Sequence, residues 1–297
     1  MPTVKRNQSA TERVSRTWFS KRLFGVAAAL VFPAGFMAGW AFWWEPSSLR
    51  VVEECVAVPL NRTAPLRAAV ITDLHTGSPF NGIPKLRMVV DRVNAANPDV
   101  VFILGDLVVH EVLGGSFVAP EPIAQELGRL HSRNGSFAVL GNHDVWLDAD
   151  RVRQALQDAA ITVLDDRAVK ITDEAGSLWV AGVGDYWTEK HNLTAALGSV
   201  LDDAPVILLT HNPDIFPDVP SRVSLTLAGH THGGQVRIPF FGSPVVPSRY
   251  GQRFAAGQIV EDSRHMYVAT GVGTSIIPIR FGVPPSVPIL ILQNTCP

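Results

Sequence analysis

LRAAVITDLH, residues 66–75, is an apolar run that passes directly into two polar side chains, Asp73 and His75. A short run rich in Val, Ile and Leu that ends at a polar or turn residue is typical of a buried β-strand. The same pattern recurs along the chain, and we expect buried strands over residues 66–72, 100–104, 137–140, 178–183, 206–210 and 225–228.

Amphipathic stretches alternate with these strands. In residues 84–97 the side chains of Leu86, Val89, Val90 and Val93 recur at i, i+3, i+4 and i+7, which predicts a helix with one buried face. We also expect helices over residues 121–131 and 150–160, and the strands of a second, closing sheet after Gly233. Alternating strands and helices indicate an α/β domain with a largely parallel central sheet.

Composition excludes several classes of protein. The 297 residues carry a net charge of -2 and a pI near 6.5, which argues against a general nucleic-acid binder. Two cysteines exclude a disulfide scaffold, a four-cysteine zinc site and a cysteine-bound iron–sulfur cluster. Only 18% of the residues are charged and the mean hydropathy is +0.17, so we expect a lipid-facing segment.

Residues 23–44 contain no charged side chain, and as a helix rising about 1.5 Å per residue they would extend roughly 33 Å. That length crosses the hydrocarbon core of a bilayer, which is about 30 Å thick. Basic residues precede the segment and acidic residues follow it: Lys5, Arg6, Arg13, Arg16, Lys21 and Arg22, then Glu45, Glu53 and Glu54. We therefore expect a single-pass signal anchor in the inner (cytoplasmic) membrane, with everything after Pro46 on the extracytoplasmic side.

Two export signals are alternatives to this anchor. Gly39-Trp40-Ala41 has small residues at the spacing of a cleavage site, although Trp40 is bulky and the apolar run is long. Residues 20–24, SKRLF, resemble a twin-arginine signal with Lys in the first Arg position. The expected organisation is a basic cytoplasmic N-terminus (1–22), the anchor (23–44), a linker (45–64), one α/β domain (65–293) and a C-terminal tail (294–297).

Five polar motifs each follow an expected strand. They are Asp73-Leu74-His75, Gly105-Asp106, Gly141-Asn142-His143-Asp144, His211 and Gly229-His230-Thr231-His232-Gly233-Gly234. Any one of them has a structural explanation as a cap, a turn or a buried polar group. Ligand-binding groups of open α/β sheets, however, gather at the carboxyl ends of strands. Together the motifs offer carboxylates, an amide oxygen and imidazoles, a donor set that suits divalent Mn, Fe or Zn.

The ordered set D-x-H, G-D, G-N-H-D, H and G-H-T-H resembles the signature of the calcineurin-like metallophosphoesterase superfamily. The continuations GGQ (233–235), GTS (273–275) and PIRFGVPP (278–285) are similar to the membrane-associated bacterial subgroup related to the YkuE and YaeI phosphodiesterases. For residues 65–293 the resemblance implies a four-layer α/β/β/α metallophosphoesterase sandwich, here preceded by one N-terminal transmembrane helix. It also implies a hydrolase with two divalent metal ions.

The resemblance implies a role for each polar side chain. The expected ligands are Asp73, His75 and His232 for one metal ion, Asn142, His211 and His230 for the other, and Asp106 as a bridge between them. His143 is expected to face the phosphoryl group and to protonate the leaving oxygen, with Asp144 orienting its imidazole. Direct attack by a metal-bound hydroxide would then need no phosphoenzyme.

These inferences lead to a membrane-anchored phosphodiesterase, because tethering favours an amphiphilic substrate such as a phospholipid or a nucleotide-linked lipid. Alternatives are a phosphomonoesterase or nucleotidase with a soluble substrate, and a noncatalytic metal-binding scaffold on the same fold. A nuclease would need a basic, aromatic-lined groove, and no Lys/Arg cluster stands out beyond the N-terminal flank, so no nucleic-acid partner is expected. An extracytoplasmic location argues against a protein phosphatase.

Five further positions remain open in the sequence. His110 stands where many relatives carry an acidic residue, and it is either near the pocket rim or simply exposed. Asp185 is better explained by a turn than by catalysis, and Arg280 could meet a substrate phosphate or lie on the surface. Cys55 and Cys296 can pair in an oxidising compartment if their Cα atoms lie within about 7 Å.

Overall fold

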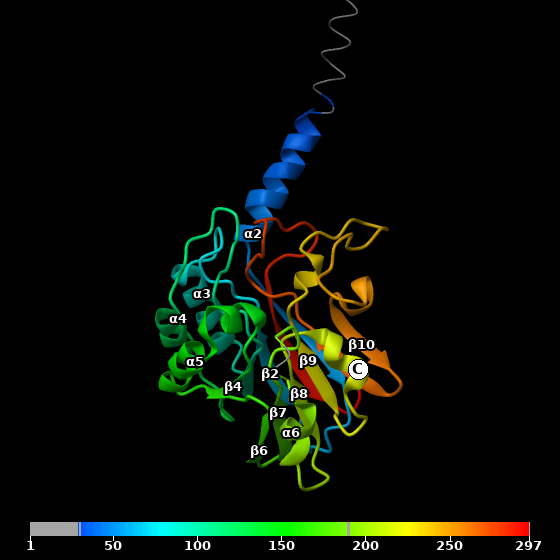
Figure 1. Ribbon diagram of the computed structural model, residues 1–297. Helices are drawn as coiled ribbons and strands as arrows, with labels where there is room; N and C mark the ends of the chain where they lie inside the picture. Colours follow the sequence, from blue (N-terminus) through cyan, green and yellow to red (C-terminus); the bar gives the residue numbers. More distant parts are fainter. Residues whose placement is uncertain (1–28, 30, 189–190, 297) are drawn as a thin grey trace, which may run out of the picture.

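Two six-stranded β-sheets pack face to face at the centre of the structure (Figure 1). The structure is a computed structural model that describes residues 29, 31–188 and 191–296. Phe102, Leu104, Val180 and Leu227 fill the space between the sheets and are buried. Because both faces of each sheet carry apolar side chains, each outer face also needs a cover of helices.

The first sheet is mixed. Its strand order is β1 (Arg50–Ala57), β12 (Ser286–Gln293), β2 (Leu66–Ile71), β3 (Val100–Ile103), β4 (Ser136–Ala138) and β5 (Thr162–Val163). β2 to β5 run parallel, whereas β12 is antiparallel to β2 and parallel to β1. The carboxyl ends of β2 to β5 therefore lie at the same end of the sheet as the beginnings of β1 and β12.

The second sheet is also mixed. Its order is β10 (Gly257–Glu261), β11 (Arg264–Val268), β9 (Leu225–Ala228), β8 (Val206–Leu209), β7 (Gly176–Gly182) and β6 (Arg167–Asp173). The strands expected near residues 178, 206 and 225 are present, but they belong to this sheet and not to the first. The second sheet therefore does not come only from residues after Gly233. Of the strands after Gly233, β10 and β11 join it, whereas β12 pairs in the first sheet. The order of the strands in the sequence does not show which of the two sheets each strand joins.

Helices cover the outer faces, which gives the layers α/β/β/α. The first sheet carries α3 (Ile83–Ala95), α4 (Pro120–Leu127) and α5 (Asn142–Asp158), and the second carries α6 (Leu193–Gly198) with the 3₁₀ turns η2 (Pro213–Asp218) and η4 (Gly251–Phe254). Leu86, Val89, Val90 and Val93 form the buried face of α3, as their spacing predicts. α5 begins at Asn142, earlier than expected, and its helical conformation is broken at Asp148.

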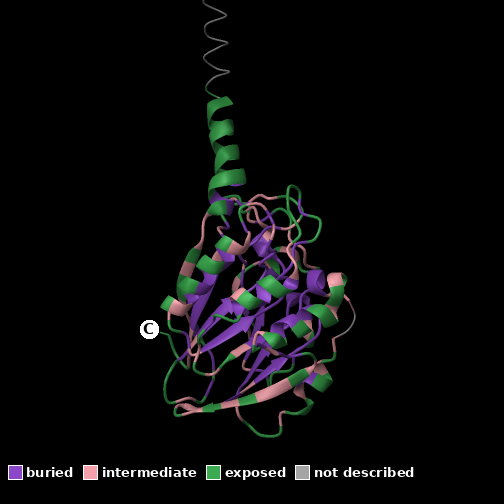
Figure 2. Ribbon diagram, turned by 90° about the vertical axis from the view of Figure 1, so that its left-hand side faces the viewer, coloured by how far each residue is buried: buried purple, intermediate pink, exposed green. Residues whose placement is uncertain are grey.

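A helix leads away from the domain at the N-terminal side of the described chain (Figure 1). Residues 31–39 are helical, and the helix continues through a π-helical turn, η1 (Trp40–Trp44), into α2 (Glu45–Ser47). Its side chains are mostly exposed (Figure 2). Among the described residues, no helix has the length and apolar character needed to cross a membrane. Residues 1–22, and 23–28 and 30 of the expected anchor, lie outside the described part.

The base of this helix is bonded to the domain. The buried carboxylate of Glu45 accepts hydrogen bonds from Trp40 Nε1 and from the backbone N–H of Val283, each at 2.7 Å. The N–H of Arg280 donates to the carbonyl of Ala41 at 2.9 Å. The helix is thus joined to the loop that precedes β12, at the end of the first sheet where the strands β2 to β5 finish.

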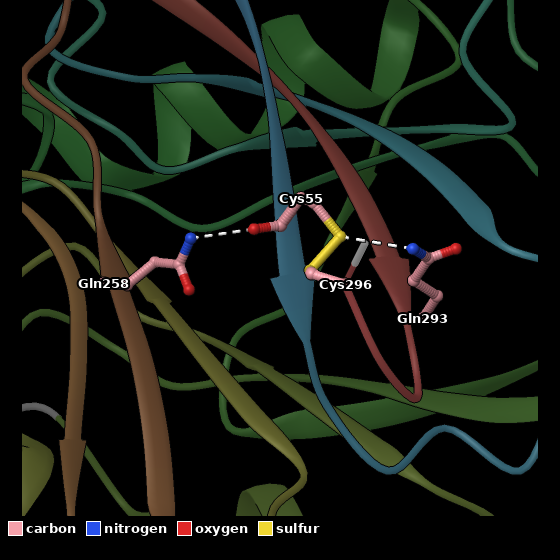
Figure 3. The surroundings of a disulfide bond; sticks show 4 residues. All are labelled: Cys55, Gln258, Gln293 and Cys296. Carbon is pink, nitrogen blue, oxygen red and sulfur yellow. Dashed lines mark hydrogen bonds between the residues drawn. A yellow bond between two sulfur atoms is a disulfide. The ribbon is translucent and has the colours of Figure 1, made fainter.

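The segment 45–64, expected as a linker, contributes the edge strand β1 to the first sheet. Within β1, Cys55 forms a disulfide bond with Cys296, across a Cα–Cα distance of 5.8 Å (Figure 3). Gln293 Nε2 donates to Cys55 Sγ at 3.2 Å, and Gln258 Nε2 donates to the Cys55 carbonyl at 2.8 Å. The two cysteines that the sequence left open are therefore paired, at the end of the sheet away from the helix.

Candidate metal centre

The five polar motifs meet at one place in the structure. The loops that follow the carboxyl ends of β2, β3, β4, β8 and β9 carry Asp73 and His75, Asp106, Asn142 and His143, His211, and His230 and His232 respectively. All of these side chains are buried. Residues from both sheets therefore come together where the carboxyl ends of their strands adjoin, as expected for ligand-binding groups of α/β folds.

One group of possible metal ligands consists of Asp73, His75 and His232, whose ligand atoms lie within 4.8 Å of one another. His75 Nε2 is 3.1 Å from His232 Nε2, and His232 Nε2 is 3.4 Å from Asp73 Oδ1. The Asp73 carboxylate also accepts from the backbone N–H of His230 at 2.9 Å, which fixes its orientation. These are the three residues that the resemblance implies as ligands of one metal ion.

A second group consists of Asp106, His211 and His230, again with ligand atoms within 4.8 Å of one another. His211 Nε2 is 3.2 Å from Asp106 Oδ2, and His230 Nδ1 is 3.2 Å from His211 Nε2. Asp106 Oδ2 is also 3.5 Å from His75 Nε2, so this carboxylate adjoins both groups.

The donor atoms fit divalent metal ions. Asn142 Oδ1 is buried and has no hydrogen-bond partner among the described residues, which is rare for a side-chain oxygen unless an ion or water completes it. Imidazole nitrogens face one another in His75 with His232 and in His211 with His230, an arrangement that a cation bound between the rings would stabilise. Carboxylate, amide and imidazole donors together suit Mn, Fe or Zn.

The backbone of the cluster adopts unusual conformations. Five predicted ligands have positive φ: Asp73 (49°), His75 (38°), Asp106 (54°), His230 (69°) and His232 (51°). Left-handed conformations are uncommon outside glycine, cost free energy and concentrate at functional sites. Two glycines let the loops approach each other, because a Cβ at Gly141 would overlap Asp106 and a Cβ at Gly229 would overlap Thr72 and Asp73.

Burial and charge set the protonation of the cluster without metal. Burial lowers the pKa of His75 and of His230 to about 3, so both are neutral, the form in which imidazole binds metals. Burial also tends to lower the pKa of His211. The effect of Asp106 is opposite and outweighs that of burial, so the pKa of His211 is raised to about 10. Burial raises the pKa of Asp106, but the neighbouring imidazole of His211 holds it well below its usual range. His211 Nδ1 donates to the Leu104 carbonyl at 2.7 Å, which turns Nε2 toward Asp106.

His143 lies beside both groups at the start of α5. Its ring is edge-on to His75, with centroids 4.6 Å apart, and its Nε2 is 3.9 Å from Asp106 Oδ2. With His75 and Asp106 it forms a third set of possible ligand atoms. Its backbone N–H donates to Asp106 Oδ1 at 2.9 Å, and burial lowers its pKa. The position agrees with a side chain that faces the metal centre.

Asp144 differs from expectation. Its Oδ1 accepts from the N–H groups of Leu107 (2.9 Å) and Val108 (3.3 Å), and its Oδ2 accepts from the N–H of Gly141 (3.0 Å). His143 Nδ1 has no hydrogen-bond partner among the described residues. Asp144 therefore ties the loop after β3 to the loop after β4 and does not orient the imidazole, because α5 turns neighbouring side chains in different directions.

Trp146 and Trp187 form an aromatic wall that borders the cluster. The sequence motifs did not predict either residue. Trp146 is 5.1 Å from His143 and Trp187 is 4.2 Å from His230, measured between ring centroids. The two indoles lie 6.4 Å apart at 27° to each other and are about half exposed. Trp146 could have been found, since it follows His143 by three residues in a helix and therefore shares its face. His110 lies 6.0 Å from Trp146, near the rim.

Arg280 and Asp185 also have defined places. Arg280 neither meets the open site nor lies on the surface: it is completely buried. Its guanidinium donates to the carbonyls of Gly273 and Thr270, and Nη2 lies 3.3 Å from His232 Nδ1, behind the cluster. Asp185 Oδ2 accepts from the N–H of Thr188 at 2.9 Å, which is the turn that the sequence favours.

A buried His/Asp cluster at the carboxyl ends of strands in a two-sheet α/β/β/α fold is a candidate centre for metal-dependent hydrolysis. The family profile described as calcineurin-like phosphoesterase matches residues 66–234, which include every predicted ligand. The chain belongs to this family of metallophosphoesterases, which hydrolyse phosphoric esters.

Relatives match most of the chain. An uncharacterized metallophosphoesterase of Bacillus subtilis, YkuE, is 28% identical over 96% of this chain and 99% of its own length. The phosphodiesterase YaeI of Escherichia coli is 29% identical over 92% of this chain and 99% of its own. A transmembrane protein with metallophosphoesterase domain from Bos taurus is 31% identical over 84% of this chain and 58% of its own.

Proposed function

We propose that this chain is a phosphodiesterase that uses two divalent metal ions. The position of Asp106 carries the proposal, since Oδ2 lies 3.5 Å from His75 Nε2 of one ligand group and 3.2 Å from His211 Nε2 of the other. A carboxylate shared in this way offsets the repulsion between two cations, which in such centres lie about 3.5–4 Å apart.

Bound at these groups, two cations supply positive charge for the phosphoryl oxygens and make a nucleophile of water at neutral pH. The side chains that would hold them are Asp73, His75 and His232 for one, Asn142, His211 and His230 for the other, and Asp106 for both. Five of these donors lie on left-handed backbone, in loops that bring the ligand atoms of each group within 4.8 Å of one another. No cysteine nucleophile is needed, and both cysteines are joined in a disulfide at the other end of the sheet.

We assign protonation of the leaving group to His143. Its side chain is 11% exposed, whereas the side chains of His75 and His211 are completely buried, so it lies on the accessible side of the cluster. An imidazole there can donate a hydrogen bond to a phosphoryl oxygen and a proton to the departing alkoxide. Asp106 supports this position by accepting the backbone N–H of His143.

The substrate that we favour is an amphiphilic phosphodiester, such as a phospholipid or a nucleotide-linked lipid. The half-exposed indoles of Trp146 and Trp187 offer an apolar wall beside the metal ligands for one ester group. The relative from Escherichia coli is named a phosphodiesterase, which supports a diester over a monoester.

We further propose that residues 23–44 anchor the chain in the inner membrane with the catalytic domain outside the cytoplasm. The segment is uncharged and preceded by basic residues. The Cys55–Cys296 disulfide supports an oxidising compartment. A relative is named a transmembrane protein. A reporter fused after Gln293 should be active only when it works outside the cytoplasm, and activity of a cytoplasmic reporter there would reverse the orientation.

Metal titration tests the two-ion proposal. The full chain is stripped with a chelator, reloaded with Mn²⁺ and assayed on an aryl phosphodiester and the matching monoester. We expect two ions per chain and turnover of the diester that follows binding of the second. Asp73→Asn is the matched variant, and it should bind one ion less.

Each other result selects an alternative. Full diester turnover with one bound ion contradicts the dinuclear proposal. Faster turnover of the monoester favours a phosphomonoesterase. Two bound ions without turnover of either ester would indicate a noncatalytic scaffold.

A further inference from the structure

Exposed apolar side chains gather around the base of the N-terminal helix. They lie at the end of η1 and in four loops, 76–82, 110–118, 235–247 and 274–283, that reach the same end of the molecule as the helix (Figure 1). We call this set the apolar collar: Trp43, Trp44, Phe80, Leu113, Phe117, Ile238, Phe240, Phe241, Val245, Ile276 and Ile277. A soluble surface rarely exposes so many large apolar side chains together.

Direct contacts join one side of the collar. The rings of Trp43 and Phe80 have centroids 6.0 Å apart, which places loop 76–82 against the helix. That loop is bonded to the next, because the N–H of Ser116 donates to the carbonyl of Gly77 at 2.8 Å. The collar thus continues from the helix through loop 76–82 into loop 110–118.

Further backbone bonds close the circle. The N–H of Leu113 donates to the carbonyl of Ile276 at 2.9 Å, which joins loop 110–118 to loop 274–283. The N–H of Arg237 donates to the carbonyl of Phe281 at 2.7 Å, which adds loop 235–247. Loop 274–283 returns to the helix through the bond from Arg280 to the Ala41 carbonyl. The four loops therefore form one connected rim with the helix rising from it.

The charge of this rim is low. Glu111 is the one acidic residue in the four loops. Arg237 and the nearby Arg50, at the start of β1, line one hollow beside the collar. Among the described residues, neither guanidinium forms a salt bridge with a carboxylate. Apolar tips with arginines just behind them match the acyl boundary and the phosphates of a lipid surface.

We propose that the apolar collar seats the catalytic domain on a lipid bilayer, with Phe240 and its neighbours inserted at the level of the headgroups. The inference rests on the anchoring proposed above. We choose a bilayer as the occupant because the helix that leaves through the collar belongs to the uncharged segment 23–44. Trp43 and Trp44 lie at its base, at the level where indoles prefer an interface. A second protein would have to surround the same helix.

This seating turns the metal centre toward the membrane. β1 begins at the collar, at the end of the first sheet where Asp73, Asp106 and Asn142 follow the carboxyl ends of β2, β3 and β4. The substrate phosphate would then be taken from the headgroup layer and not from bulk water. Membrane seating thus narrows the proposed substrate class to diesters that reside in the bilayer.

Depth-dependent fluorescence tests the collar in the full chain. Both native cysteines are bonded to each other, so a cysteine introduced at Phe240 takes an environment-sensitive label alone. The labelled chain is reconstituted into vesicles of phosphatidylcholine with a minority of phosphatidylglycerol. We expect its emission to shift to the blue and to be quenched by lipids brominated on the acyl chains. Phe80→Cys, on another loop, should behave alike.

The matched control is Leu201→Cys. Leu201 is 87% exposed and lies before β8, at the amino ends of the strands, so its label should keep its aqueous emission and escape quenching. If the Phe240 label stays aqueous while carbonate washing leaves the chain in the vesicles, the collar is refuted and the anchor stands. Release of the chain by carbonate refutes both. A Phe240 label shielded only in cross-linked pairs of chains would replace the bilayer with a second copy.

Discussion

The two ends of the paired sheets have opposite character. At the carboxyl ends of β2, β3 and β4, buried Asp, Asn and His side chains converge, with left-handed backbone and several polar atoms that have no hydrogen-bond partner among the described residues. At the amino ends two links join distant parts of the chain: the disulfide bond between Cys55 and Cys296, and the ion pair of Arg62 with Asp173 at 2.6 Å. The carboxyl ends thus present donor atoms that could bind ions, and the amino ends link distant segments of the chain to each other.

This division explains how a strained centre can persist. Each left-handed ligand costs of order 1–3 kcal/mol. The packed apolar layers and the covalent tie at the other end offset that cost. Variants at the carboxyl ends should therefore lose activity while the fold remains stable, and variants at the amino ends should do the reverse.

Asp106→Asn should remove activity at the carboxyl end. The amide keeps an acceptor for the N–H of His143, so folding should persist, but the shared charge for two ions is lost. We expect lower occupancy of both ions and a rate reduced by about a thousandfold or more. Asp99→Asn is the matched change at the amino end, where Asp99 accepts from the N–H of Arg67 at 2.8 Å, and it should leave the rate intact. Full metal content and rate in Asp106→Asn would remove the bridging role.

His143→Ala separates proton transfer from metal binding. Metal content should be unchanged, while turnover falls by roughly a hundred- to ten-thousandfold, the usual contribution of a positioned acid. Esters with strongly basic leaving groups should suffer most, because they need a proton as the bond breaks. Equal losses for both kinds of ester would point to charge stabilisation alone. Loss of an ion would make His143 a ligand, as its closeness to His75 and Asp106 allows.

Removing the disulfide should affect stability and not rate. The bond links residues 241 apart in sequence, so it restricts the unfolded chain strongly. Replacing both cysteines, Cys55→Ser with Cys296→Ser, should lower the free energy of unfolding by about 2–5 kcal/mol, measured by chemical denaturation. Turnover at low temperature should stay as in the parent. A reductant should weaken the parent protein and leave the double variant unchanged; a large fall in kcat would contradict the division between the ends.

Trp187→Ala should have the smallest effect and depend on the substrate. Losing one indole of the aromatic wall should raise KM by about three- to tenfold for a diester with a bulky apolar or aromatic group. A short dialkyl diester, which cannot reach the wall, should be unaffected. Trp179→Ala is the control, since this residue of β7 donates to Asp202, away from the cluster. Equal KM changes for both substrates would mean that Trp187 only supports His230.

The convergence of the candidate ligands could be predicted because its signals are local. Asp73 and His75 follow their strand within four residues, and Asn142 begins a helix directly after a short strand. Parallel strands place such ends together whatever their order in the sheet. The periodicity of α3 likewise gave its buried face without knowledge of its partner.

Features that depend on distant contacts could not be read in this way. β1 lies in a segment that resembles a linker, because its partner β12 is more than two hundred residues away. Arg280 is buried by loops that carry no repeating pattern. Asp144 looked like a partner of His143 because the two are adjacent in sequence, yet the helix directs them to different groups. Trp187 enters the site from a loop of the second sheet.

The pairing of β1 with β12 also has a mechanical consequence. The N-terminal helix leads into β1, so any pull on the helix loads this strand along its axis. Eight residues of β1 pair with β12 in parallel, and tension in that direction must shear these bonds together instead of opening them one after another. Beyond them the Cys55–Cys296 bond fastens the strand covalently. A load from the membrane side is therefore carried by the edge of the first sheet, not by the loops that hold the metal ligands.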